Sequence, residues 1–310
     1  MKGEYFGVIT AIFWAVGIFP FALSTKYFRA THMNLMRLML ALLLLSPCIM
    51  LAEGISFHSL FSSPGYTNWL WLGLSGIIGL ALGDYFSFSS FRAIGAKNSS
   101  IFSTLAPSSA ILFGYLLLGE TINLIGLGGI LITVFGIIYI SLQQRDSGHA
   151  FNLAGMGYAI GAALCQGAGL ILAKKAYENN PIEIIAFHAA WIRIFASVVT
   201  LFIFSLLTGE MRIMGRNAIN PENRKGLLYM FLGTLFGTVM GLSFAMQTVS
   251  SINGAVAQTI FSLVPVFAIP LAYLFHKEKI TLPIILGALI AIAGVIILIW
   301  REAISAWFNL

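Results

Sequence analysis

The sequence predicts an all-α membrane protein in which ten transmembrane helices form two inverted five-helix repeats. Three observations lead to this prediction. Charged residues make up only 9% of the 310 residues, long apolar segments recur along the chain, and the two halves of the chain resemble each other. A soluble domain carries roughly a quarter charged residues. The composition therefore excludes a disordered chain, a fibrous protein and an ordinary soluble domain.

Ten apolar segments have the length of a membrane span, since a helix needs about 20 mostly apolar residues to cross the hydrocarbon core. In the first half they are residues 5–24, 33–52, 69–90, 99–118 and 122–142. In the second half they are residues 153–173, 184–207, 226–246, 254–275 and 280–300. The first segment lacks a small-x-small cleavage site and is longer than a signal-peptide core, so we expect a retained helix.

The internal repeat is the strongest indication of the architecture. Over residues 79–141, a shift of 158 residues gives 18 identities in 63 positions without a gap. Chance gives about one identity in ten positions in so apolar a sequence. Shifts of 158, 156 and 152 residues align Gly79 with Gly237, Pro107 with Pro265, Arg37 with Arg193, and Trp14 with Gln166.

Each half holds five predicted spans, and because five is odd the second half must begin on the opposite side of the membrane. We therefore expect repeat one at residues 1–142, a linker at 143–152, repeat two at 153–301 and a C-terminal tail at 302–310. Inverted repeats are typical of secondary transporters, whose substrate site lies near the bilayer midplane between the repeats. Two complete repeats enclose such a site within one chain, so a monomer is sufficient.

Several short motifs resemble those of a known family. They are Gly83-Asp84-Tyr85-Phe86, Arg92-Ala93-Ile94-Gly95-Ala96, Leu105-Ala106-Pro107 and Leu117-Leu118-Gly119-Glu120, with Leu263-Val264-Pro265 and His276-Lys277-Glu278 in the second half. With Arg37 and Arg193 they make the whole chain similar to two EamA modules of the drug/metabolite transporter superfamily. The resemblance implies a bacterial inner-membrane carrier, often an exporter of amino acids or other small metabolites. Leu242 stands where the first copy has Asp84, and Lys277 replaces the Gly before Glu278.

Asp84 lies inside the third predicted span, where an isolated charge is costly. Its carboxylate can take up a proton reversibly and couple transport to a proton gradient, or it can bind a substrate ammonium. The alternative is a structural ion pair with Arg37, Lys26 or Arg92. An intramembrane aspartyl protease would need two carboxylates that share a proton, and no predicted span contains a second Asp.

Arg37 and Arg193 each lie a few residues inside a predicted span. The planar guanidinium suits a substrate carboxylate. The alternative is a shared architectural role, with the side chain extended toward the interface, because both copies carry the residue.

Six further residues within the spans are candidates for a cavity that would suit a zwitterionic or aromatic metabolite. They are Trp14, Tyr85, Gln166, His188, Trp191 and Gln258. For each of them helix packing or interface anchoring is the alternative, and for His188 a proton relay or a simple hydrogen bond.

Pro107 and Pro265 fall near the centres of corresponding spans, and paired helix interruptions in a transporter point to its binding site. Glu120 and Glu278 lie at span ends, where we expect each carboxylate to complement the dipole of the helix that follows. These prolines are the candidate helix breaks, and the two Glu residues are expected to be structural.

We expect no enzyme activity, cofactor or metal, because the chain has no GxxxxGK[ST] loop and no metal-ligand spacing. The expected partners are a small-molecule substrate, with protons as a candidate coupling ion, and the lipid bilayer; no nucleic acid is expected. Carriers of nucleosides, sugar-linked nucleotides or quaternary amines are the alternative function, followed by a membrane enzyme or receptor. The two indications of orientation disagree: the Lys/Arg distribution favours extracytoplasmic termini, whereas the family resemblance implies cytoplasmic termini.

Overall fold

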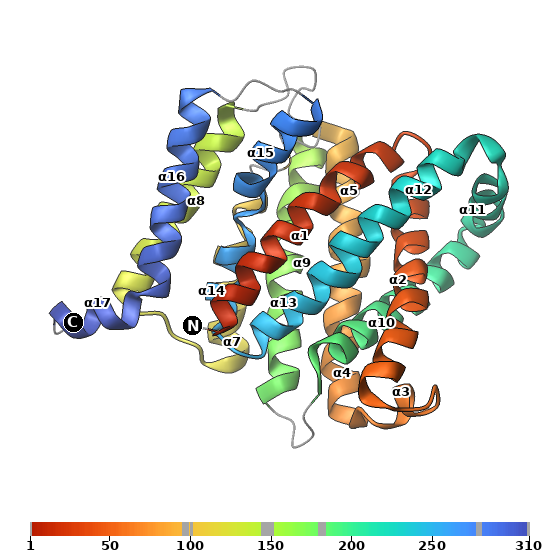
Figure 1. Cartoon of the computed structure of the whole chain (residues 1–310), viewed down its shortest axis with the longest axis horizontal. Coiled ribbons are helices and arrows are strands. Elements are labelled where there is room, and N and C mark those ends of the chain that lie inside the picture. Colours follow the sequence, from red (N-terminus) through yellow and green to blue (C-terminus); the bar gives the residue numbers. More distant parts are fainter. Residues whose placement is uncertain are drawn as a thin grey trace.

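The computed structural model describes residues 2–94, 99, 102–143, 152–178, 184–276 and 281–308. All regular secondary structure within these residues is helical, which agrees with the all-α prediction. The helices pack side by side, and α8 and α16 lie together at one edge of the molecule (Figure 1).

The elements follow the order that the apolar segments predict. The first half contains α1 (Lys2–Ser24), α2 (Ala30–Glu53), α3 (Ser59–Ser62), α4 (Gly65–Gly76), the π-helix η1 (Ile77–Leu82), α5 (Gly83–Ile94), α7 (Ala106–Leu118) and α8 (Leu124–Gln143). The second half contains α9 (Leu153–Glu178), α10 (Ala186–Leu207), α11 (Glu210–Ile219), the short 3-10 helix η2 (Pro221–Asn223), α12 (Arg224–Gly233), the π-helix η3 (Thr234–Gly241), α13 (Leu242–Val249), α14 (Gly254–Phe261), α15 (Val264–His276), α16 (Leu282–Ile299) and α17 (Arg301–Phe308).

Eight helical segments in the described part of the chain are long and apolar enough to cross a membrane. They are Gly3–Phe21, Thr31–Glu53, Gly65–Ser90, Leu153–Glu178, Ala186–Leu207, Pro221–Val249, Gly254–Leu271 and Leu282–Ile299. The other two predicted spans, residues 99–118 and 122–142, correspond to the shorter apolar helices Ala106–Leu118 and Leu124–Ile140. The 13 residues of α7 extend over about 20 Å, less than the hydrocarbon core of about 30 Å.

The helix interruptions that the prolines predict occur at both positions. The chain forms a turn at Thr104 and Leu105 before α7 begins, and another at Ser262 and Leu263 before α15 begins. In each case the proline is the second residue of the new helix. Proline fits there because its missing N–H falls among the first helical N–H groups, which have no acceptor within the helix. At both positions one helical segment therefore ends and a new helix, α7 or α15, begins.

Glycines allow the helices of one half to cross those of the other at close range. A Cβ at Gly17 in α1 would lie 2.8 Å from the Cα of Gly237 in η3. A Cβ at Gly169 in α9 would lie 2.8 Å from the Cα of Gly79 in η1. The repeat shifts relate these two crossings, because Gly169 aligns with Gly17 and Gly237 with Gly79. The first helix of each half therefore packs on the third helix of the other half.

The pair formed by α8 and α16 has the same reciprocity. A Cβ at Gly129 would lie 2.9 Å from the carbonyl oxygen of Gly294, and one at Gly136 would lie 2.7 Å from that of Gly287. The 158-residue shift exchanges these two contacts, because it moves Gly129 onto Gly287 and Gly136 onto Gly294. The two final helices of the repeats thus pack on each other through matching surfaces.

The third span of each half contains a π-helical segment, and π-helices are rare in proteins. η1 covers Ile77–Leu82 and η3 covers Thr234–Gly241, so the 158-residue shift overlays them. Both segments contain the glycines that allow the first helix of the other half to approach.

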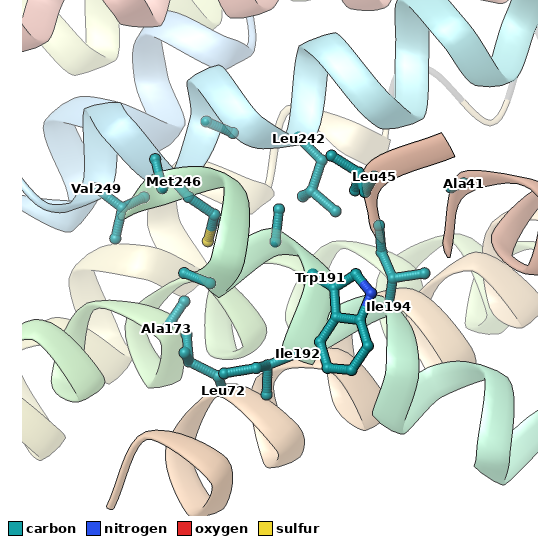
Figure 2. Packing of buried hydrophobic residues seen from close by; sticks show 14 of the residues in the cluster. Ala41, Leu45, Leu72, Ala173, Trp191, Ile192, Ile194, Leu242, Met246 and Val249 are labelled. Atoms are coloured by element: carbon teal, nitrogen blue, oxygen red, sulfur yellow. The ribbon is translucent and has the colours of Figure 1, made fainter. Parts of the chain in front are cut away.

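The largest hydrophobic cluster lies where α2, α4, α9, α10 and α13 meet. Figure 2 shows Trp191 at its centre, with Leu45 and Leu242 nearby and Leu72 on the opposite side. Trp14 and Trp69 pack against the same cluster from its rim.

Candidate functional site

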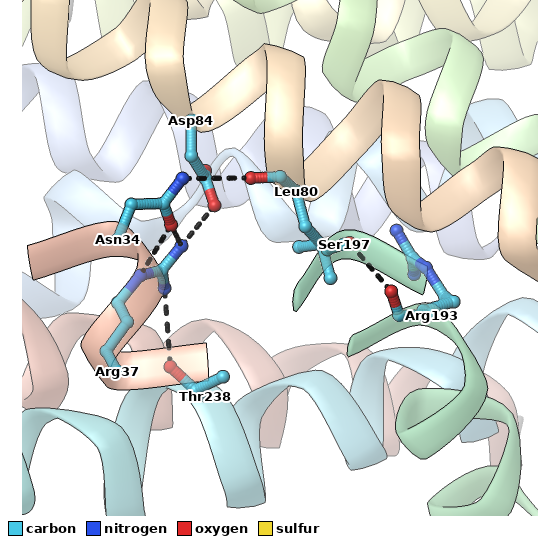
Figure 3. Close-up of polar contacts among 7 residues, drawn as sticks. All are labelled: Asn34, Arg37, Leu80, Asp84, Arg193, Ser197 and Thr238. Atoms are coloured by element: carbon cyan, nitrogen blue, oxygen red, sulfur yellow. Dashed lines mark hydrogen bonds and ion pairs between the residues drawn. The ribbon is translucent and has the colours of Figure 1, made fainter. Parts of the chain in front are cut away.

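Arg37 and Asp84 form an ion pair between α2 and α5 (Figure 3). The Asn34 Oδ1 atom accepts hydrogen bonds from Arg37 Nε at 3.1 Å and from Nη2 at 2.9 Å. Arg37 Nη1 donates to Thr238 Oγ1 of η3 at 3.3 Å. Asn34 Nδ2 donates to the carbonyl of Leu80 in η1 at 3.2 Å. One guanidinium thus connects α2 with the third span of each half.

The surroundings of Arg37 explain why a charge is tolerated at this depth. Its side chain is 11% exposed and that of Asp84 is 20% exposed. The guanidinium carbon also lies 5.6 Å from the ring centroid of Phe21 and 5.8 Å from that of Phe88. Buried charges are stable when they are paired and fully hydrogen-bonded. Of the alternatives for Asp84, the structure contains the ion pair with Arg37.

Arg193, the repeat counterpart of Arg37, has a different environment. It is only 4% exposed, and its Nη1 has the Sδ of Met246 as a neighbour at 3.2 Å. Its Nε is buried without a hydrogen-bond partner. Among the residues that the structure describes, Arg193 has no ion-pair partner. The repeat positions of Asn34 and Asp84 are occupied by Ala190 and Leu242, which cannot accept a hydrogen bond from a guanidinium.

Two His–Glu pairs join α2 to the α10–α11 segment. Near the start of α2, His32 Nε2 contacts the Glu210 carboxylate, and Arg29 Nη1 lies 3.5 Å from Glu210 Oε1. His32 is 2% exposed, so the Glu210 carboxylate contacts a buried imidazole ring.

The second pair lies at the other end of α2. His188 Nδ1 is 3.4 Å from Glu53 Oε1, and His188 Nε2 is 2.9 Å from the carbonyl of Leu60. Both ring nitrogens therefore face oxygen atoms that can accept a hydrogen bond. The helix from His32 to Glu53 extends over about 30 Å, which matches the hydrocarbon core. The two pairs thus close opposite ends of the same helix pair.

Two predicted site tryptophans belong to the hydrophobic packing. Trp191 is 2% exposed, and its indole N–H donates to Ser46 Oγ at 2.8 Å. Its ring stacks on Phe195 with 5.3 Å between centroids. Trp14 contacts the edge of Phe261, 5.1 Å between centroids. Both side chains therefore take part in helix packing, which is the alternative given above for each of them.

The remaining predicted residues are dispersed. Gln258 is buried in α14, whereas Gln166 is half-buried in α9. Tyr85 is 37% exposed and pairs with Phe86, so it lies apart from the Arg37 cluster although it follows Asp84 in sequence. The structure therefore brings together Arg37 and Asp84 but not the whole predicted set.

Glu120 contacts a helix start, although not the one that the sequence predicts. Its carboxylate accepts the Gly254 N–H at 3.2 and 3.1 Å, at the start of α14 in the other half, and lies 3.4 Å from Lys174 Nζ. Burial raises the pKa of the Glu120 carboxyl, and the Lys174 ammonium and the Gly254 N–H oppose this rise. The expected dipole partner, the helix that follows in sequence, is therefore wrong for Glu120. Glu278 lies outside the described residues.

Sequence reasoning missed His32, Glu53 and Glu210 as functional candidates. The signal was available, because the 156-residue shift that pairs Arg37 with Arg193 also pairs His32 with His188. The Glu partners have no such local signal, since they approach the histidines only across the fold.

Two cavities lie away from these residues. One of about 340 Å³ is lined by Met36, Leu40, Leu227, Met230 and Phe231 and is apolar. Another lies along α11, beside Arg212, Ile213, Arg216 and Asn217. Within the described residues, no group of three or more His, Cys, Asp or Glu side chains is arranged to hold a metal ion.

Comparisons with known proteins identify the family. A protein of Clostridium kluyveri named as an uncharacterized transporter is 26% identical over 307 residues, which cover 96% of this chain and 92% of that protein. A solved structure titled only as the crystal structure of a protein has a TM-score of 0.76 at 14% identity, covering 97% of this chain and 98% of that one. It shows a similar fold. A model of the EamA-like transporter family matches residues 1–142 and 153–300. The two segments that this family model matches span nearly the whole sequence. The chain therefore belongs to the EamA-like transporter family.

Proposed function

We propose that this protein is a secondary transporter of small metabolites, most simply amino acids, that works by alternating access in the inner membrane. The observation that supports this is the reciprocity of its packing. The crossing of Gly17 with Gly237 and that of Gly169 with Gly79 are one contact made twice, with the roles of the halves exchanged. In alternating access the two repeats exchange conformations around a central site, and such a pair of contacts allows this exchange.

In this proposal the chain has ten spans, and repeats one and two (residues 1–142 and 153–301) are inverted with respect to each other. The eight long apolar helices supply eight of the spans. The segments ending in α7 and α8 supply the other two, because α8 has 20 residues and the helix break before α7 corresponds to the one before α15. One chain then encloses the site, and a monomer is sufficient.

The two His–Glu pairs are proposed as gates. A transporter that alternates needs one closed gate at each face, and the pairs His32–Glu210 and His188–Glu53 hold α2 and α10 together at opposite ends. Both are closed in this structure, as expected of an occluded state. Opening toward one side requires one pair to separate while the other holds.

The charges near the middle of the bundle support a zwitterionic substrate. Asp84 and Arg193 have opposite charges, and Leu80 lies between them in the view of Figure 3. The carboxylate of Asp84 would serve either a substrate ammonium or a coupling proton. In both cases Asp84 must exchange its present partner Arg37 during the transport cycle.

Flux measurements test the function. We would reconstitute the purified protein into liposomes loaded with labelled amino acids and record efflux with and without a pH gradient. We expect selective efflux that Asp84→Asn reduces, whereas the control Glu222→Gln, an exposed acid far from the bundle centre, leaves it unchanged. Efflux of nucleosides or quaternary amines with no efflux of amino acids would reject the amino-acid assignment. No flux of any solute would reject the transporter proposal.

Cysteine labelling tests the membrane architecture separately. With Cys48 and Cys165 replaced, single cysteines at the exposed positions Thr121 and Asn152, on either side of α8, should react with an impermeant maleimide from opposite sides. Labelling of both positions from one side would show that α8 does not cross the membrane and would reject the ten-span arrangement.

A further inference from the structure

We propose that Arg193 is the binding residue for a single carboxylate on the transported molecule, and that Arg37, its counterpart in the repeat, is not. The inference rests on the proposed function only in taking the bound molecule to be the cargo. It is carried by three features of the structure: the missing partner of Arg193, the glycine that faces its guanidinium, and the carboxylate that pairs with the equivalent Arg37.

The first feature is an uncompensated charge. Arg37 and Arg193 are the two buried cationic side chains of the described residues. Arg37 has a carboxylate and two hydrogen-bond acceptors, whereas Arg193 has a thioether at 3.2 Å and a buried Nε without a partner. A buried ion is costly unless it is paired. A charged residue retained inside a membrane without a partner points to a ligand that supplies the opposite charge.

The second feature is the glycine that faces Arg193. A Cβ at Gly79 of η1 would lie 3.3 Å from the Nη2 atom of Arg193, which is closer than an ordinary van der Waals contact. Any larger residue at position 79 would therefore crowd the guanidinium. The hydroxyl of Tyr177 in α9 is also buried without a hydrogen-bond partner. The described residues thus contain a second buried hydrogen-bond donor that the protein leaves unused, and an anion accepts hydrogen bonds from donors of this kind.

The third feature comes from the repeat itself. At Arg37 the protein fills the equivalent space with the carboxylate of Asp84. At Arg193 the equivalent residue is Leu242, so the protein provides no carboxylate there. The first half therefore shows which chemical group this arrangement accepts, and the second half leaves that position to the ligand.

The number of available charges limits the class of anion. Lys174, a basic residue of α9, is paired with Glu120 at 3.4 Å and Glu178 at 3.5 Å. A phosphate or a nucleotide would require several free cations, whereas one guanidinium fork matches one carboxylate. The site thus favours monocarboxylates, among them neutral amino acids, over phosphorylated metabolites.

Binding is tested by thermal unfolding of the purified full chain in detergent. The probes are pools of neutral amino acids, the amines that lack their carboxylates, and inorganic phosphate. We expect the amino acids to raise Tm in a saturable way and the amines and phosphate to have no effect. Arg193→Gln should weaken the apparent affinity about tenfold or more, since hydrogen bonds to charged groups are lost. Arg193→Lys, which keeps the charge but lacks the fork, should fall between them.

Arg216→Gln is the matched control, because it makes the same chemical change at an exposed position of α11. It should behave as the wild type. Without ligand, Arg193→Gln should have an unchanged or higher Tm and elute as a monodisperse peak, which separates loss of binding from loss of folding. An amino-acid-dependent rise in Tm that survives in Arg193→Gln would overturn the proposal, as would equal stabilisation by the amines or no stabilisation of the wild type by any amino acid.

The liposome flux assay distinguishes this proposal from the proposed function. Binding that depends on Arg193 without any flux would support the carboxylate site and reject the transporter. Flux of amines at the same rate as amino acids would support the transporter and reject Arg193 as a carboxylate anchor.

Discussion

Replacing Arg37 by glutamine removes the positive member of a buried ion pair and leaves the Asp84 carboxylate uncompensated. The Asp84 side chain is 20% exposed, so water replaces little of the lost interaction. Breaking such a pair costs about 3 kcal/mol. With about 2 cal/mol/K of unfolding entropy per residue over 310 residues, this corresponds to a decrease in Tm of about 5 °C.

The reverse change, Asp84→Asn, should cost less. Arg37 keeps its hydrogen bonds to Asn34 and Thr238, and the new amide oxygen still accepts one bond. We expect a loss of about 2 kcal/mol, or about 3 °C. The double variant leaves neither charge buried, so its loss should be about 2 kcal/mol and well below the sum of the single losses. Arg193→Gln, the same substitution at the equivalent position, should not lower Tm.

The assay is thermal unfolding of the four variants and the wild type in one detergent, followed by intrinsic tryptophan fluorescence. Two results would refute the reasoning. Additive effects in the double variant would mean that the Arg37–Asp84 pair contributes nothing as a pair. A loss for Arg193→Gln as large as that for Arg37→Gln would mean that Arg193 has a stabilising partner in the protein.

Three further predictions follow from contacts elsewhere in the fold. Gly169→Ala places a Cβ 2.8 Å from a neighbouring backbone atom and should destabilise the protein by about 1–3 kcal/mol. The control Gly157→Ala lies on the same helix, meets no atom within 4 Å and should be neutral or stabilising. Equal Tm values for the two variants would contradict this prediction. Because burial raises the pKa of Glu120 above its ordinary value of 4.5, the folded protein binds this proton more tightly than the unfolded chain. The stability of the wild type relative to Glu120→Gln should therefore be highest below pH 4.5 and fall as pH rises through the folded-state pKa; a difference in Tm that grows with pH would contradict the sign. Glu210→Gln should speed hydrogen exchange at the start of α2, and Glu53→Gln should speed it at the start of α10; faster exchange at both ends in either variant would argue against separate gates.

The positions of the helices followed from the sequence because apolar segments in a membrane protein have few alternatives to helix. The glycine-lined contact between the first helix of one half and the third of the other was not predicted as a contact, although the repeat had singled out Gly79 and Gly237 as a pair. The short α7 was not predicted either. Hydropathy does not detect the turn at Thr104 and Leu105 that precedes α7.

The site was predicted less completely, for a physical reason. The charged candidates were chosen because each charge in an apolar span requires a partner or a ligand, and their roles stay predictions. The partners come from distant parts of the chain: Thr238 contacts Arg37 across 201 positions, and Gly254 contacts Glu120 across 134 positions. Among the aromatic candidates, Trp191 lies in the hydrophobic cluster, and its indole N–H donates a hydrogen bond to Ser46. A composition rule cannot separate an aromatic cavity lining from an aromatic core.

The π-helical segment η1 also sets the direction in which Asp84 leaves its helix. A π-helical turn holds one residue more than an α-helical turn, and in an α-helix each residue advances the chain by about 100°. Deleting a single residue between Gly76 and Gly83 would therefore rotate everything after it by about a quarter turn and carry Asp84 away from Arg37. The equivalent segment η3 lies 158 residues further along the chain, so both halves contain the extra residue. Only the first half uses this orientation for an acidic side chain, because Leu242 stands where the first half has Asp84.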